Sequence, residues 1–334
     1  FETPVGAQAR LDAIDNALSH DRQRERLSTS VDAHINQTAI GLFLDESVRL
    51  TKWLTVRGGV RLDRADASVE DRLDDPSALG NRDGGSKGAT LASPKGSVIL
   101  SPLKWLNFFV NVGRGFHSND ARGAVRSVDP ATLLVPATGY EVGVRAAPWK
   151  PLTLTAVAYR LDLDSEQIYV GDAGTTEPSD PSTRMGIELA GRLYFGHWLF
   201  ADAAATFNRA VHRPNSGNAG AVALAPTRTI TAGVGFRAPF GTFGSIRMRH
   251  IGPRPATQDE RITAEGWTVF DARLGHRHGP VELALDVQNL FNSEWREVQF
   301  ATESRLQNEA APVEEIHFAP GWPFTFRATL TAYF

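Results

Sequence analysis

The chain has 334 residues, a formal net charge of −3 and no cysteine. A chain of this length can bury a large core, and its nearly balanced charge gives no indication of nucleic-acid binding. The lack of cysteine excludes disulfide scaffolds, cysteine-ligated zinc and thiol catalysis. No apolar run reaches the roughly 18 residues that a transmembrane helix requires, so a helical membrane protein is excluded as well.

Apolar and polar residues alternate with a period of two in segment after segment, whereas helical periodicity is nearly absent. The segments approach the roughly 9 to 11 residues of a tilted strand that crosses a bilayer. We expect thirteen strands, which in chain order are residues 37–50, 53–63, 91–101, 105–112, 139–145, 152–162, 185–195, 198–208, 229–237, 242–251, 267–277, 281–287 and 324–334.

The connections between these segments are of two lengths, short and long, which alternate along the chain. Short ones occupy residues 51–52, 102–104, 148–151, 196–197, 239–241 and 278–280. Long, polar connections such as 64–90 and 170–184 lie between them. Outer-membrane barrels have short periplasmic turns and longer extracellular loops, so the pattern predicts an all-β, transmembrane, antiparallel up-and-down β-barrel.

The seven tryptophans lie at strand ends or in loops rather than in the middle of strands. Amphipathic rings at both ends of the spans are typical of the aromatic girdles at membrane interfaces. We therefore predict a membrane-interface girdle of Trp53, Trp105, Trp149, Trp198, Trp267, Trp295 and Trp322.

The final segment, FTFRATLTAYF, keeps strict alternation up to Phe334. An open sheet edge is not tolerated in hydrocarbon, so this strand must pair with another strand. We expect it to take part in barrel assembly and closure through Phe326, Tyr333 and Phe334.

Strand direction assigns the first 36 residues to the extracellular side. Thirteen strands are an odd number, whereas bacterial single-chain barrels have an even number. We interpret residues 1–36 as an extracellular loop or strand extension left from a truncated upstream barrel, and residues 37–334 as the C-terminal barrel strands.

Several stretches resemble the TonB-dependent outer-membrane receptors in the order in which that family has them. LALDVQNLFNSEW (283–295) and FAPGWPFTFRATLTAYF (318–334) are similar to the family's C-terminal end. Residues 40–63 and 93–123 are similar to its hairpins. The resemblance implies the C-terminal part of a plugged barrel of about 22 strands, with the plug domain absent from this sequence.

The same resemblance implies a location and partners. The location is the outer membrane of a Gram-negative bacterium, and the activity is energised uptake of a scarce nutrient such as a ferric siderophore or similar metal chelate. The implied partners are the lipid bilayer and lipopolysaccharide, the TonB complex through an N-terminal region, the barrel assembly machinery and a small-molecule ligand, without nucleic acid.

Candidate ligand or plug contacts cluster in GRGFHSNDARG, where a strand meets its extracellular loop. They are Arg114, His117, Asn119, Asp120 and Arg122. The alternative, which we favour, is that these side chains make hydrogen bonds that order the loop.

Arginines gather on the lumen-facing side of the expected strands. Arg145, Arg247 and Arg273 are further candidate ligand or plug contacts, because such a wall attracts anionic cargo. The alternative, slightly favoured, is that these arginines pair with lumen or plug acids. The full set is Arg57, Arg61, Arg145, Arg192, Arg237, Arg247, Arg273 and Arg327, opposite acids such as Glu141, Glu188, Asp271 and Asp286.

No metal site, cofactor or catalytic centre is predicted. Asp162, Asp164 and Glu166 alternate on one side of a strand, but a solvated strand extension explains them better than a bound cation. His276 and His278 lack a third ligand. Two other functions remain open, a passive porin of about 14 strands and a soluble all-β binding protein.

Overall fold

A computed structural model describes residues 2–73, 84–127, 130–170, 175–213 and 220–334, with the backbone alone for residues 166–170 and 175–178. The chain divides into two compact units, each of which is described by itself. Unit 1 comprises Phe1–Leu100, Val110–Tyr140 and Leu161–Thr183; unit 2 comprises Ser101–Phe109, Glu141–Arg160 and Arg184–Phe334.

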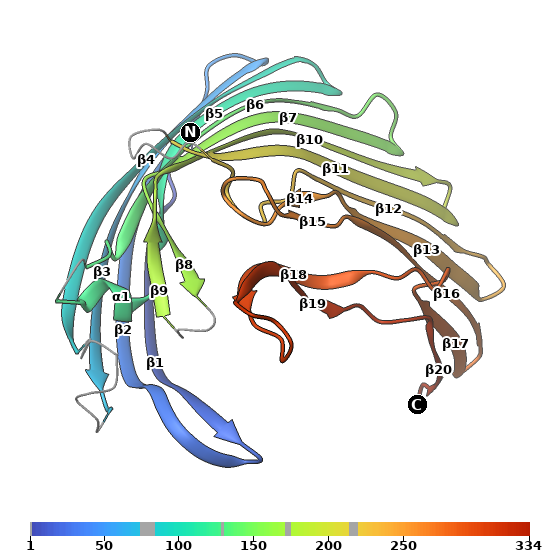
Figure 1. Ribbon diagram of the computed structural model, residues 1–334. Coiled ribbons are helices and arrows are strands. Elements are labelled where there is room, and N and C mark those ends of the chain that lie inside the picture. Colours follow the sequence, from blue (N-terminus) through green and yellow to red (C-terminus); the bar gives the residue numbers. More distant parts are fainter. Residues whose placement is uncertain (1, 74–83, 128–129, 171–174, 214–219) are drawn as a thin grey trace. The chain divides into compact units, whose positions relative to one another are not determined.

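Fourteen strands form one hydrogen-bonded sheet. Its order follows the chain, β1-β2-β3-β4-β5-β6-β7-β10-β11-β12-β13-β16-β17-β20, and its registered pairs are antiparallel. Figure 1 shows neighbouring strands connected in this up-and-down order. Among the described residues, no helix has both the length and the apolar character that crossing a membrane requires.

Unit 1 is built on the first strands of the sheet. Five strands of the sheet, β4, β5, β6, β7 and β10, have residues in both units. The elements are β1 (Val5–Arg22), β2 (Glu25–Arg49), β3 (Leu54–Asp71), β4 (Gly85–Leu103), β5 (Leu106–Ser118), α1 (Ala121–Val125), β6 (Leu134–Ala146), β7 (Leu152–Leu163), β8 (Glu166–Val170) and β9 (Thr175–Ser179).

Unit 2 holds the remaining sheet strands and two small antiparallel ribbons, β14-β15 and β18-β19. The elements are β10 (Ser182–Phe195), β11 (Leu199–His212), β12 (Arg228–Arg237), β13 (Thr242–Ile251), β14 (Arg254–Pro255), β15 (Thr263–Ala264), β16 (Trp267–His278), β17 (Val281–Gln288), β18 (Arg296–Ser304), β19 (Val313–Pro320) and β20 (Thr325–Ala332).

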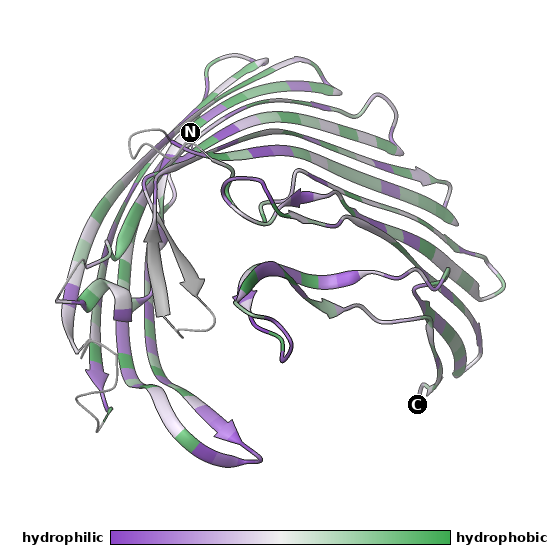
Figure 2. Cartoon of the chain, viewed as in Figure 1, coloured by the Kyte–Doolittle hydropathy of each residue, from purple (hydrophilic) through white to green (hydrophobic). Residues whose placement is uncertain are grey.

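The sheet has one apolar face and one polar face because side chains alternate along every strand. In β17, Leu283 and Leu285 are 58% and 42% exposed, whereas Glu282 and Asp286 point to the other face and form ion pairs there. Figure 2 shows the resulting bands of hydrophobic and hydrophilic colour along the strands. In the described part of the chain, no other element covers the outward aliphatic face, as the barrel prediction requires.

Each of the thirteen expected segments falls on a strand of the main sheet and extends at most two residues past its ends, and β1 is the fourteenth strand. Residues 5–22 form a full strand of the main sheet, within the stretch 1–36 that we interpreted as an extracellular loop or strand extension. Glu2 bridges to Ser47 and Val5 pairs with Leu44, so β1 begins beside the short-turn end of β2. Its outward side carries mainly alanines, including Ala7 and Ala9, which weakened the hydropathic signal.

The expected long connections also contain more strand than the sequence indicated. β3 continues to Asp71 and β4 begins at Gly85, so only the middle of 64–90 lies outside strands or outside the described residues. The stretch 170–184 overlaps β8, β9 and the start of β10, and its residues 171–174 lie outside the description. The sequence did not reveal these extensions because polar residues occupy both of their faces. A strand that extends beyond a membrane meets water on both sides and lacks the alternation of apolar and polar residues.

Phenylalanine rings lie against glycines of neighbouring strands on the polar face of the sheet. Phe200 is opposite Gly235 and Phe243 is opposite Gly275. A Cβ atom at Gly235 would lie 2.2 Å from the ring of Phe200, and one at Gly275 would lie 2.3 Å from the ring of Phe243. The glycines thus leave space for the rings, a pairing that helps to fix strand register. The same close contact joins Phe43 to Gly6 and Phe109 to Gly143.

Candidate ligand-binding site

The segment 113–123 does not form one cluster of free side chains. Arg114 has the same parity in β5 as Val112 and Phe116, whose side chains are exposed on the apolar face. His117 has the opposite parity. Alternation along the strand therefore separates the two residues that we had grouped together.

The rest of that segment orders a loop in unit 1. Asp120 caps the five-residue helix α1 by accepting a hydrogen bond from the Arg122 backbone nitrogen at 2.9 Å, and its side chain pairs with the Arg122 guanidinium at 2.6 Å. The buried side chain of Asn119 donates to the carbonyl oxygen of Thr132 at 2.8 Å. The structure thus agrees with the loop-ordering alternative for these three residues.

Helix α1 sits on an apolar patch of the otherwise polar face. Ala121 and Ala124 are 1% and 0% exposed. They pack in one buried cluster with Ala33, Ile35, Ala67, Val69 and Leu133. This cluster holds the loop on β2 and β3 and shows why inward positions near the ends of these strands are apolar.

Many inward arginines pair with acids of the same strand or of a strand one or two places away in the sheet, as the slightly favoured alternative predicts. Arg247 lies 3.2 Å from Asp202, and Arg273 lies 3.4 Å from Asp286 and 3.9 Å from Glu282. Two other arginines do the same, Arg249 with Asp271 at 3.1 Å and Arg61 with Asp63 at 2.8 Å, and Lys95 pairs with Asp45 at 2.8 Å.

Another set of inward arginines has no ion pair with an acid in the described part of the chain. It includes Arg145, Arg192 and Arg237 in unit 2, which lie near the short-turn ends of β6, β10 and β12. An unpaired cation projects its field further than a paired one, so these three arginines make the wall near the short turns more positive than ion-paired arginines would.

The candidate metal positions do not form a site. No group of three or more histidine and acidic side chains suited to a metal exists among the described residues. Asp162 accepts a hydrogen bond from the Thr183 hydroxyl at 2.6 Å, and the side chain of Glu166 lies outside the description. His276 and His278 stack with ring centroids 6.5 Å apart, and His276 contacts the Thr242 hydroxyl at 2.9 Å.

An asparagine clamp, formed by Asn289 and Asn292, connects the end of β17 to the start of β20. Asn289, 1% exposed, donates to the carbonyl oxygens of Ser293 at 2.8 Å and Trp322 at 3.1 Å, and accepts from the Ser293 nitrogen. Asn292 accepts from the Phe324 nitrogen at 2.9 Å. Both asparagines have φ near +50°, a conformation that asparagine tolerates better than most residues. The Asn-Leu-Phe-Asn motif is thus a clamp between two strands.

Two of the seven tryptophans that we expected in the girdle pack against each other on the polar side of the sheet. Trp295 is only 9% exposed, and its ring centroid lies 4.7 Å from that of Trp267, which has the inward parity of Val269 and Asp271. Arg249 stacks over Trp295 at 5.8 Å, and the indole nitrogen of Trp295 donates to the Trp322 carbonyl oxygen at 3.0 Å. Loop position alone could not distinguish these packed rings from lipid-facing ones.

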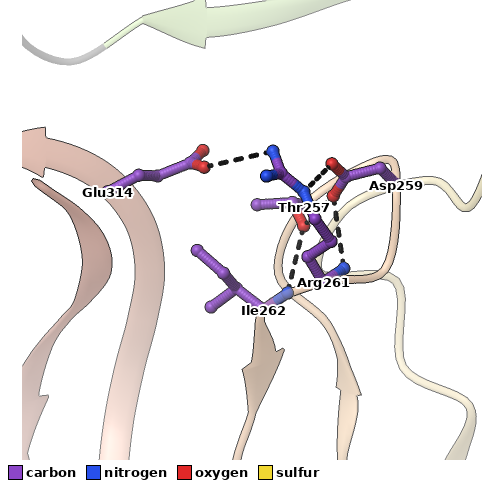
Figure 3. A network of polar contacts seen from close by, with 5 residues as sticks. All are labelled: Thr257, Asp259, Arg261, Ile262 and Glu314. Atoms are coloured by element: carbon purple, nitrogen blue, oxygen red, sulfur yellow. Dashed lines mark hydrogen bonds and ion pairs between the residues drawn. The ribbon is translucent and has the colours of Figure 1, made fainter.

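The two ribbons of unit 2 are joined by polar contacts. The side chain of Gln299 makes two hydrogen bonds with the backbone of Glu265. It accepts from the Glu265 nitrogen at 2.9 Å and donates to the Glu265 carbonyl oxygen at 2.8 Å. Arg261 forms an ion pair with Glu314 of β19 at 4.0 Å. Figure 3 shows the two side chains directed toward each other. Arg261 also pairs with Asp259. Hydrogen bonds from the Thr257 hydroxyl and then from Arg261 lower the pKa of Asp259 from 3.8 to about 2.

Two cavities flank Trp295 in unit 2. One, of about 500 Å³, lies on the polar side of β13, β16, β17 and β20, with Trp322 at its border; we call it the Trp322 cavity. The other, of about 480 Å³, lies between the two ribbons and includes Trp267 and Phe318. Both volumes are in the range of small-molecule sites. Our candidate residues included neither Arg249 nor Gln288, since single inward side chains carry no signal of convergence.

Comparison with known proteins agrees with the fold. In structure the chain is similar to the ferric yersiniabactin uptake receptor FyuA from Yersinia pestis, with 17% identity and a TM-score of 0.74. It is also similar to the ferric citrate transporter FecA, with 14% identity and a TM-score of 0.71, and to the copper transporter OprC, with 16% identity and a TM-score of 0.71.

These matches cover 99% of this chain but 51%, 51% and 53% of those three structures. The chain therefore spans about half the length of the structures that it resembles. Comparison with curated protein sequences gives no match. The profile of the family described as "TonB dependent receptor-like, beta-barrel" matches residues 5–290, most of the sequence. The chain belongs to the TonB-dependent receptor-like β-barrel family.

Proposed function

We propose that this chain is the C-terminal part of the barrel of an outer-membrane receptor that imports a scarce nutrient into a Gram-negative bacterium. The cargo class that we place first is a ferric siderophore or similar metal chelate. The protein then acts in transport and not in catalysis. Family membership supports this proposal, as do similar structures whose names specify ferric yersiniabactin, ferric citrate and copper.

The observation that carries the proposal is the division of the sheet into two chemically different faces. The outward face exposes side chains such as Leu283 and Leu285, while the inward face carries ion pairs such as Arg247–Asp202. A soluble protein rarely leaves an apolar surface of this extent uncovered. A lipid-facing exterior and a polar lumen are the arrangement of a transmembrane β-barrel.

Partners follow from the same proposal. Lipid and lipopolysaccharide cover the outward face, with Trp53, Trp105, Trp149 and Trp198 at the membrane interface; their side chains are 41% to 64% exposed. The TonB complex engages an N-terminal region outside this sequence. The barrel assembly machinery recognises the last strand, through Phe326, Tyr333 and Phe334.

Energised uptake separates this proposal from a passive porin. Cells that produce the complete natural chain are supplied with radiolabelled ferric chelates, with and without a functional TonB protein. We expect iron accumulation that disappears without TonB or after an uncoupler collapses the inner-membrane potential. Diffusion of small solutes that is indifferent to TonB would favour the porin instead, and a protein that remains in the soluble fraction would contradict both.

A further inference from the structure

The Trp322 cavity combines charged, amide and aromatic side chains in one place. Its floor is the polar face of β13, β16, β17 and β20, and Trp295 and Trp322 border it above the strand ends. The asparagine clamp fixes the backbone at this border, because the Trp322 carbonyl oxygen accepts hydrogen bonds from the side chains of both Asn289 and Trp295. The cavity therefore has a wall that is held in place without a ligand.

The charge of this cavity does not favour an anion. Arg249 and Arg327 line it together with the three carboxylates of Asp271, Asp286 and Glu297, so acids outnumber bases by one. Arg249 is paired with Asp271 at 3.1 Å, and Asp286 is paired with Arg273 at 3.4 Å. With Arg273 counted, three arginines face three carboxylates, so the cavity offers an anion no net attraction, and an anion would have to displace one of the paired acids.

Hydrogen-bonding capacity in the cavity is nevertheless unused. Within the described residues, the side chains of Gln288, Glu297 and Arg327 make no hydrogen bond or ion pair. The buried Nε of Arg249 likewise has no acceptor. An amide both donates and accepts, a carboxylate accepts and a guanidinium donates. Donors and acceptors that line one cavity match hydroxyl groups, each of which does both.

The border of the cavity offers a flat apolar surface as well. The side chain of Trp322 is 64% exposed, and its indole nitrogen makes no hydrogen bond within the described part of the chain. Sugar rings have a face of C–H groups and a rim of hydroxyls. Such a ring can stack on an indole while its rim reaches the polar floor, since tryptophan combines a large apolar surface with a polar edge.

We propose that the Trp322 cavity binds a saccharide, an uncharged ring rich in hydroxyl groups, with Trp322 as the stacking surface and Gln288, Glu297 and Arg327 as its hydrogen-bond partners. The inference rests on the proposed function insofar as the ligand arrives as imported cargo. The sugar has two sources, a free saccharide or a sugar joined to a metal chelate. The same contacts recognise both.

The test measures binding to the purified complete chain in an amine-oxide detergent, because maltoside and glucoside detergents carry sugars themselves. The probes are maltose, cellobiose and lactose. Titration calorimetry and tryptophan fluorescence measure their binding. A second arm compares a ferric catecholate with and without an attached glucose. Trisodium citrate serves as the anionic probe.

Trp322→Ala and Gln288→Ala remove the stacking surface and one polar partner. Trp149→Ala is the matched control, because Trp149 is also 64% exposed but follows β6 at the short-turn end. We expect a saccharide, free or chelate-linked, to bind the natural protein and to bind Trp322→Ala at least about tenfold more weakly, a difference that calorimetry resolves readily. Trp149→Ala should bind like the natural protein.

Each result decides the question. Binding of a free disaccharide identifies the sugar as cargo, and a preference for the glucose-bearing chelate identifies it as part of a metal carrier. The proposal is overturned if no sugar-bearing probe binds, if Trp322→Ala binds as well as the natural protein, or if citrate alone binds. This binding requires no TonB, so a failure here is distinct from the loss of energised uptake in cells.

Discussion

The side-chain nitrogen of Asn289 lies 3.1 Å from the backbone oxygen of Trp322, thirty-three residues later in the chain. This bond connects the end of β17 to the residues that precede β20. Because β17 and β20 are neighbours in the sheet, the clamp fixes where the last strand begins. The 25-residue stretch 296–320 between them is thereby attached at a defined point.

Two substitutions of Asn289 separate the contribution of its side-chain hydrogen bonds from that of its positive φ. Asn289→Gly keeps the positive φ without strain but loses three side-chain hydrogen bonds, so we expect unfolding free energy to fall by roughly 2 to 3 kcal/mol. Asn289→Ala should lose about 1 kcal/mol more, because alanine is strained at positive φ. Urea unfolding in lipid vesicles measures both. Equal stability of the two variants and the natural protein would show that the clamp is unimportant.

Gly235 tests the fit between ring and glycine on the polar face. In Gly235→Ala the new methyl group would lie 2.2 Å from the ring of Phe200, so the ring or the strand must move. We expect a cost of about 1 to 3 kcal/mol, typical of overpacking. Thermal unfolding measures it, with Gly58→Ala as the control, since no atom lies within 4 Å of a Cβ there. Adding Phe200→Leu should restore stability; if it does not, the clash is not the cause.

The strands were predictable from sequence because alternation survives wherever one face meets an apolar phase. Leu283 and Leu285 against Glu282 and Asp286 give a strong signal. β1 escaped notice because its outward alanines contrast weakly with their polar neighbours. Strand extensions such as the end of β3 escaped because polar residues occupy both faces where water surrounds them.

The candidate site was much less predictable than the fold. The inward parity of Arg247 and Arg273 followed from alternation, yet their acid partners depend on strand register, which local sequence does not contain. Trp295 stood in a loop like the other tryptophans, and only the folded structure buries it against Trp267. Asn289 belonged to a motif that the sequence revealed, but its role as a clamp required the coordinates.

Neutralising inward arginines should distinguish paired from unpaired positions. Arg247→Gln leaves Asp202 without its partner at 3.2 Å, so we expect a loss of less than about 1 kcal/mol, because both side chains are partly exposed. Arg145→Gln removes the same charge without breaking an ion pair and should leave stability unchanged. Denaturant unfolding of Arg145→Gln, Arg247→Gln, Asp202→Asn and the Arg247→Gln/Asp202→Asn double variant makes the comparison and completes the double-mutant cycle. A larger loss for Arg145→Gln would contradict the assignment.

Asp259 should titrate at unusually low pH. Its pKa is about 2 in the folded protein, against an ordinary 3.8, with the Thr257 hydroxyl as the largest cause and Arg261 next. Because the folded pKa is lowered, the carboxylate's stabilising contribution is fully present above about pH 4 and is lost as pH falls through 2. Carbon-13 NMR of labelled aspartate measures this titration. Thr257→Val should raise the midpoint, and an unchanged midpoint would remove Thr257 as a cause.

The central claim is that the outward face of the sheet meets lipid. Single cysteines from 281 to 288, introduced into the complete chain and spin-labelled in reconstituted vesicles, report on each position in turn. Oxygen dissolves in the bilayer, so its relaxation effect should be strong at 281, 283, 285 and 287 and weak at the positions between them. Uniform accessibility along β17, or protection of Leu283 and Leu285 by other protein, would contradict the account.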